Sequence, residues 1–108
     1  MIAGLKFYIM IRTIVNSPFL AFYDYDEPNE RLVIYLKTGQ QILVDKFGKA
    51  AYSRLNRERN KGSYMFHHIL DNPIYDKWEG DRISRYMIEK IIIESTNQKP
   101  QVYRWLAS

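Results

Sequence analysis

The sequence predicts an α+β fold. We expect an antiparallel meander of three to four strands, one basic helix packed on it, a short second helix and a C-terminal helical extension. Three observations support this. Residues 19–46 hold short apolar runs of strand length, separated by turn residues. Residues 49–62 have helical composition, and residues 82–95 repeat apolar side chains at helical intervals.

The length and composition indicate one small domain. A chain of 108 residues fits a single domain, so we expect a domain over residues 1–80 and a docked extension over residues 81–108. The absence of cysteine excludes a disulfide framework and a thiolate metal site. The apolar N-terminus is interrupted by Lys6 and Arg12, unlike a secretory signal. No run approaches the roughly 20 apolar residues that span a bilayer. We therefore expect a cytoplasmic protein without a membrane partner.

The first two strands are predicted from alternation and from proline. Residues 5–12 alternate in the period typical of a strand. Residues 16–18 end it, because proline lacks the amide hydrogen that a strand ladder needs. A second, aromatic-rich strand is expected over residues 19–25. Residues 26–30 have the composition of a turn.

The next two strands form the best-defined hairpin. Residues 31–37 are apolar on both faces, which favours a central position in the sheet. Thr38 and Gly39 supply a tight turn, and residues 41–46 return as the next strand. The sequence therefore predicts a meander.

The basic helix is expected over residues 49–62. One side should face the sheet through Ala51, Tyr52 and Leu55. The solvent side should carry Arg54, Arg57 and Lys61. Gly62 is expected to end this helix. Ser63 should then cap a short helix over residues 64–70.

The C-terminal part is predicted to be helical. Asp81 can cap a helix over residues 82–95, with Ile83, Met87 and Ile91 on one face. The β-branched run 91–93 would also suit a strand, but we expect the helix. Residues 102–106 suit a last strand or a docked tail.

Residues 19–78 resemble the KTSC domain, which occurs at the C-terminus of some lysyl-tRNA synthetases and as free-standing small bacterial proteins. The matching residues are Tyr25-Asp26, Leu32, Val33, Lys37-Thr38-Gly39, Tyr52, Leu55, Lys61-Gly62, Tyr64, Phe66, Ile69 and Tyr75. One departure is Ile42-Leu43-Val44, where the family usually shows Tyr-x-Tyr. The resemblance implies RNA binding as a suggested role. The missing tyrosines would remove aromatic rings that can stack on bases.

The charge distribution indicates one positive surface. The formal net charge is +4. Between residues 46 and 61 the only acid is Glu58, against Lys46, Lys49, Arg54, Arg57, Arg59 and Lys61. Such a surface can meet a polyanion, and a solvated helix face is the alternative.

We therefore predict a small, non-enzymatic binding module for nucleic acid, with RNA as the first candidate. The phosphate-binding candidates are Lys37, Lys46, Lys49, Arg54, Arg57 and Lys61. Tyr64 and His67 are the candidates for stacking on bases. The alternative is a protein-interaction module or inhibitor. It would bind an acidic partner, or form a homodimer through the apolar segment 83–93.

No catalytic, metal or cofactor site is predicted. His67 and His68 would point about 100° apart on a helix, so they cannot chelate one ion together. The acidic residues between 24 and 30 fit no calcium loop. No glycine-rich phosphate loop or nucleophile elbow is present. A metal-independent ribonuclease needs no short motif and stays a second alternative.

Overall fold

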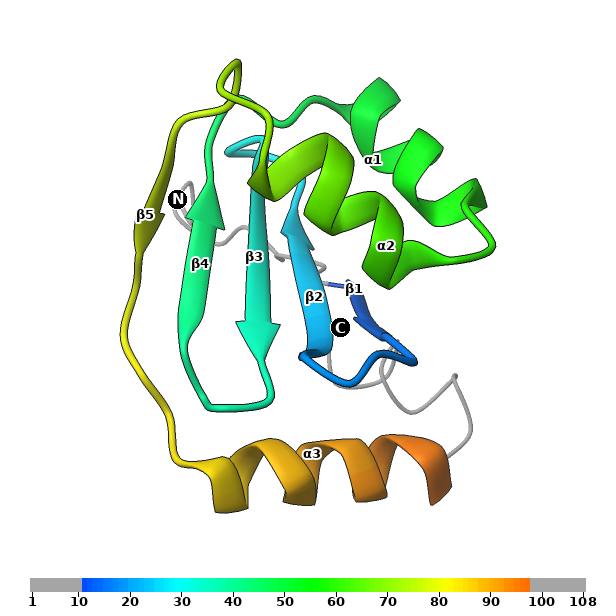
Figure 1. The fold of residues 1–108 in the computed structure, drawn as a ribbon, viewed down its shortest axis with the longest axis vertical. Coiled ribbons are helices and arrows are strands. Elements are labelled where there is room, and N and C mark those ends of the chain that lie inside the picture. The colour runs from blue at the N-terminus through cyan, green and yellow to red at the C-terminus, as the bar shows by residue number, and fades with distance from the viewer. Residues whose placement is uncertain (1–10, 98–108) are drawn as a thin grey trace, which may run out of the picture.

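The computed structural model describes residues 11–97 and shows an α+β fold with an antiparallel meander (Figure 1). Over these residues the sheet has five strands in the order β1-β2-β3-β4-β5. The strands are β1 (Ile11–Ile14), β2 (Leu20–Asp26), β3 (Arg31–Leu36), β4 (Gln41–Val44) and β5 (Lys77–Glu79). The helices are α1 (Lys49–Arg57), α2 (Lys61–Met65) and α3 (Arg85–Asn97), and η1 (Phe66–Leu70) is a π-helical turn that continues α2.

The alternation of side chains in β2 separates two apolar layers. Tyr23 and Tyr25 point to one face of the sheet, whereas Phe22 and Asp24 point to the other. The predicted strands 19–25, 31–37 and 41–46 are confirmed as β2, β3 and β4 to within two residues. β3 is the central strand, as its two apolar faces predict.

The first face of the sheet is covered by α1, α2 and η1 (Figure 1). Each helical segment contributes one fully buried apolar side chain: Leu55, Met65 and Ile69. Tyr52 packs against the same cluster and stacks on Tyr25 with 4.0 Å between ring centroids. The predicted inward side of the basic helix is therefore confirmed.

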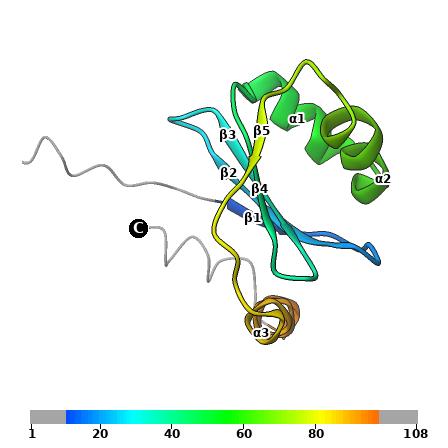
Figure 2. The same ribbon diagram turned by 60° about the vertical axis from the view of Figure 1, so that its left-hand side comes forward.

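The second face is covered at one end by α3 (Figure 2). Ile88 is buried against Ala21 and Phe22, and Ile91 and Ile92 pack around it. The helix expected near residues 82–95 is confirmed. Of the three residues predicted on its inward face, Ile83 and Ile91 pack against this cluster, whereas Met87 is exposed. At the start of the helix the Ser84 hydroxyl accepts the Met87 amide at 3.1 Å. Within residues 11–97, no helix has the length and apolarity needed to cross a bilayer.

The prediction that Gly62 ends the basic helix is wrong. α1 ends at Arg57, and Gly62 lies inside α2. A Cβ at Gly62 would lie 3.0 Å from the Ser17 Cβ, so the glycine lets α2 approach the β1–β2 loop closely. Asn60, and not Ser63, caps α2, since its side-chain oxygen accepts the Ser63 amide at 3.0 Å.

β5 is absent from the prediction. It has only three residues, and Trp78 is flanked there by Lys77 and Glu79, so it gives no apolar run. Pairing with β4 positions it. The predicted strand over residues 5–12 is seen only in its last part as β1, because residues 5–10 lie outside the described residues. The strand or tail expected over residues 102–106 also lies outside them.

Candidate nucleic-acid interface

The outer side of α1 carries the densest set of predicted cations. Arg54 and Arg57 are exposed three residues apart, on the side opposite the buried Leu55. Lys49 is exposed at the start of the helix, and no acidic residue occurs within α1. The Lys49 ammonium lies 3.7 Å from the Glu27 carboxylate, but both side chains are largely solvated and such a pair is weak. Lys49, Arg54 and Arg57 are called the α1 surface below.

Lys46 lies just before α1, at the end of β4. Its φ of 55° places the backbone in the left-handed region, and the next residue, Phe47, is buried in the core. The backbone here is held by the Phe47 amide, which donates to the Glu30 carbonyl at 2.8 Å. Lys46 is exposed and lies in the short segment between the end of β4 and the start of α1.

Lys61 is not part of the solvent face of α1, contrary to the prediction. It begins α2, is half-buried, and its ammonium donates to the Glu58 carbonyl at 2.9 Å. A cation at this place neutralises the carbonyl end of α1. The residue is misassigned because the spacing argument assumed one unbroken helix over residues 49–62.

The two predicted stacking residues lie in different environments. The Tyr64 ring is half-buried against the core and 4.7 Å from the His68 ring. His67 is exposed on η1. Tyr64 is therefore engaged in packing, whereas His67 remains at the surface.

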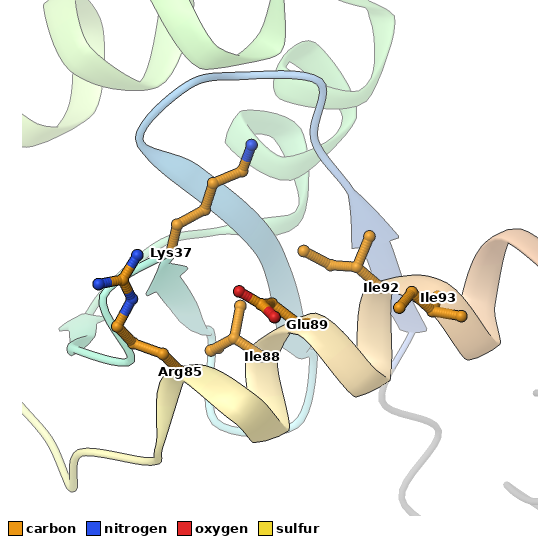
Figure 3. A pocket seen from close by; sticks show the side chains of 6 residues that line it. All are labelled: Lys37, Arg85, Ile88, Glu89, Ile92 and Ile93. Carbon is orange, nitrogen blue, oxygen red and sulfur yellow. The ribbon is translucent and has the colours of Figure 1, made fainter.

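Lys37 lies at the opposite end of the sheet from Lys46. It follows β3 and lines a cavity of about 350 Å³ together with residues of α3 (Figure 3). The other lining residues are Arg85, Ile88, Glu89, Ile92 and Ile93. The Lys37 side chain is directed away from α3 (Figure 3). The structure therefore separates Lys37 from the α1 surface.

A second cleft lies between the β1–β2 loop and the segment that joins α1 to α2. It has a volume of about 520 Å³ and is called the linker cleft. Its lining residues are Ile14, Val15, Asn16, Arg59, Asn60 and Lys61. The exposed Arg59 belongs to the basic segment, but the prediction of a continuous helix gave it no place in the site.

Two phenylalanines form an exposed pair next to this loop. The side chains of Phe19 and Phe66 are in edge-to-face contact with 6.1 Å between ring centroids. The predicted strand over residues 19–25 includes Phe19, and Phe66 is one of the residues that resemble the KTSC domain. The apolar sequence pattern does not show whether a phenylalanine is exposed, because exposed and buried phenylalanines look the same in it.

Two tyrosines have raised pKa values because they are packed in the core, and this does not indicate a role in acid–base chemistry. Burial raises the pKa of Tyr23 from 10.0 to about 12 and also raises the pKa of Tyr35. The Tyr23 hydroxyl donates to the Asn56 side chain at 2.6 Å. Both tyrosines thus remain protonated at neutral pH. Among residues 11–97, no group of three or more His, Cys, Asp or Glu side chains is placed to hold a metal ion.

No protein-family profile matches this chain, and no curated protein sequence matches it either. The resemblance of residues 19–78 to the KTSC domain thus stays a prediction.

Proposed function

We propose that the protein is a small nucleic-acid-binding module that contacts phosphates through the α1 surface. The observation that carries this proposal is the exposure of Arg54 and Arg57 on a helix without a single carboxylate. Guanidinium groups bind phosphate oxygens in a bidentate manner and stay charged at every physiological pH. Lys49 and Lys46 extend the positive charge toward the start of α1.

The proposed ligand is RNA, and the proposed location is the cytoplasm. A helix that meets phosphates only through charge does not distinguish one sequence from another. The binding should therefore be non-specific and should weaken steeply with salt, because counterions are released when phosphates are neutralised. The suggested RNA binding of the KTSC family, which residues 19–78 resemble, agrees with this choice.

The test is a fluorescence anisotropy titration with labelled single-stranded and double-stranded RNA and DNA. The variant Arg54→Glu/Arg57→Glu should weaken binding of all four by at least about tenfold at low salt, because two attractive contacts become repulsive. The matched control is Arg82→Glu/Lys90→Glu, which changes the net charge equally at exposed positions outside the α1 surface. Equal losses in both variants would contradict a localised site, and no binding to any of the four would sink the proposal.

A protein-interaction role is the second candidate, and α3 favours it. Tyr86, Met87 and Ile93 are exposed on this helix, with fractional exposures of 71%, 43% and 58%. Tyr86 and Ile93 are seven residues apart, so they lie on one side of α3. An exposed apolar helix side is the usual form of a helical docking surface. A second copy of the chain is the partner that we propose for it.

A further inference from the structure

Phe19 and Phe66 form an exposed pair of aromatic side chains. The fractional exposures are 64% for Phe19 and 37% for Phe66. In an edge-to-face contact, one ring uses its edge and keeps both faces free of its partner. A single exposed phenylalanine needs no explanation, but two in contact form an aromatic platform.

Hydrogen bonds to the backbone hold in place the two segments that carry Phe19 and Phe66. The Ser17 hydroxyl accepts the amides of Phe19 and Leu20, each at 3.2 Å. On the helical side, the Phe66 amide donates to the carbonyl of Gly62, one turn earlier. Gly62 in turn packs closely against Ser17. The two rings thus come from segments that are fixed to each other, so stacking on them costs little additional ordering.

Basic residues occur in the segments next to the platform. On one side, the Lys37 amide donates to the Phe19 carbonyl at 2.8 Å, which places Lys37 beside Phe19. On the other side, the residues next to the Ser17–Gly62 contact, Asn16 and Lys61, line the linker cleft. Arg59 lies in the same cleft, near the end of α1. The backbone of Lys37 thus adjoins Phe19, and the linker cleft with Arg59 adjoins the Ser17–Gly62 contact.

We infer that this surface binds a single-stranded nucleic acid. An unpaired base stacks on Phe19 and Phe66, and the neighbouring phosphates meet Lys37 on one side and Arg59 in the linker cleft on the other. Stacking on aromatic side chains needs a base whose face is free, which a continuous duplex does not offer except at its ends. The inference rests on the proposed function and adds the class of strand and the position of the base.

The platform lies at a different place from the tyrosines that the KTSC domain, which residues 19–78 resemble, carries in the corresponding strand. Ile42, Leu43 and Val44 occupy β4 without an aromatic ring. Phe19 and Phe66 bring rings to a different place, at the β1–β2 loop and η1. Binding to unpaired bases therefore does not require aromatic residues in β4.

The experiment compares one labelled strand with the blunt-ended duplex of the same sequence at low salt. The variant Phe19→Leu/Phe66→Leu keeps apolar bulk but removes the rings. We expect it to weaken single-strand binding by about fivefold or more, since stacking contributes about that much per base or more. Duplex binding should change less than twofold. The variant Phe19→Tyr/Phe66→Tyr should keep single-strand binding, because tyrosine also stacks.

Two controls separate stacking from folding and from charge. Thermal unfolding shows whether the leucine variant is folded at the assay temperature. The wild type should bind a strand with scattered abasic sites more weakly than the intact strand. The leucine variant should bind these two strands with equal affinity. Tyr86→Leu removes an exposed ring on α3 and should leave the affinity for the single strand unchanged.

The outcomes distinguish this inference from the proposed function. If the wild type binds strand and duplex equally, and the leucine variant binds both as the wild type does, the platform is not a base site. Charge reversal on the α1 surface can still weaken both ligands in that case, and the proposed function stands alone. If no nucleic acid binds, both proposals fail together.

Discussion

At the scale of single residues, Tyr23 links the core to alkaline stability. The side chain is fully buried, and burial raises its pKa to about 12, against 10.0 in the unfolded chain. The unfolded state therefore loses this proton first. The stability that the protonated tyrosine contributes is complete below pH 10 and is lost as the pH rises from 10 toward 12.

The variant Tyr23→Phe should not show the part of the stability loss above pH 10 that comes from ionisation of Tyr23. Two pKa units correspond to at most about 2.7 kcal/mol, so wild type and variant should differ in the slope of unfolding free energy against pH above pH 10. Urea unfolding at pH 8, 10 and 11.5 measures the slope. Other buried tyrosines leave a residual slope in both proteins. Identical slopes would show that Tyr23 ionises freely in the folded state.

Arg12 and Asp24 form a bidentate ion pair on the second face of the sheet. Both hydrogen bonds measure 2.8 Å, and Asp24 is buried. The guanidinium also lies 4.4 Å from the centre of the Phe22 ring. Arg12→Leu leaves a buried carboxylate without its cation.

We expect Arg12→Leu to lower the free energy of unfolding by about 3–5 kcal/mol, the usual cost of breaking a buried pair. Arg12→Leu/Asp24→Asn should recover part of this loss, because the second change removes the orphaned charge. Chemical unfolding of both variants provides the measurement. A cost below about 1 kcal/mol for the single variant would place the pair in the class of solvated surface pairs.

At the scale of elements, Gly39 joins the β3–β4 hairpin to α3. Its φ is 97°, and a Cβ there would overlap the carbonyl oxygen of Ile83. The Ile83 amide donates to the Gly39 carbonyl at 3.0 Å. A short glycine turn is thus the point to which the segment before α3 is attached.

Gly39→Ala should cost at least about 1–3 kcal/mol through backbone strain and should loosen α3 from the sheet. Hydrogen exchange should speed up at the α3 amides and stay unchanged at those of α1. Gly48→Ala is a matched control, since Gly48 has φ of −72° and space for a Cβ. Equal protection of α3 in both variants would exclude this anchoring role.

The elements show which features a sequence pattern can predict. Short apolar runs of strand length between turn residues located β2, β3 and β4, because strand and turn residues are distinguished by local composition. The roles of Gly62 and β5 depended on partners distant in sequence, Ser17 and β4. A glycine that permits close packing has the same local pattern as a glycine that ends a helix. The break between α1 and α2 was missed for that reason.

The candidate site was predicted in part. Lys49, Arg54 and Arg57 were expected on the outside of a basic helix, and that is where they lie. Arg59 and the pair of Phe19 and Phe66 were missed. Their positions follow from the packing of α2 on the β1–β2 loop, a tertiary contact that no periodicity encodes.

At the scale of the whole molecule, α3 is the element through which we expect association. The sequence pointed to the apolar segment 83–93, but Ile88, Ile91 and Ile92 pack against the sheet. The exposed apolar side chains of α3 are Tyr86, Met87 and Ile93. Substitutions there leave the core intact, whereas a charge at Ile91 would disturb the docking of α3.

Tyr86→Glu/Ile93→Glu should convert a dimer to a monomer without loss of fold, because both side chains are exposed. Light scattering after gel filtration gives the mass, and circular dichroism reports the fold. Arg82→Glu serves as the control at an exposed position before the helix. A wild type that is monomeric at the highest soluble concentration would rule out the second copy as partner.

The α1 surface gives the whole molecule its proposed function, and the salt dependence of binding tests it most directly. The dissociation constant of one labelled single strand is measured from about 50 to 200 mM salt, for wild type and for Arg54→Gln/Arg57→Gln. Each phosphate contact contributes about 0.7 to the logarithmic slope for a single strand. We predict that the slope falls by about 1.4 in the variant. A slope equal to that of the wild type would contradict phosphate binding by the α1 surface.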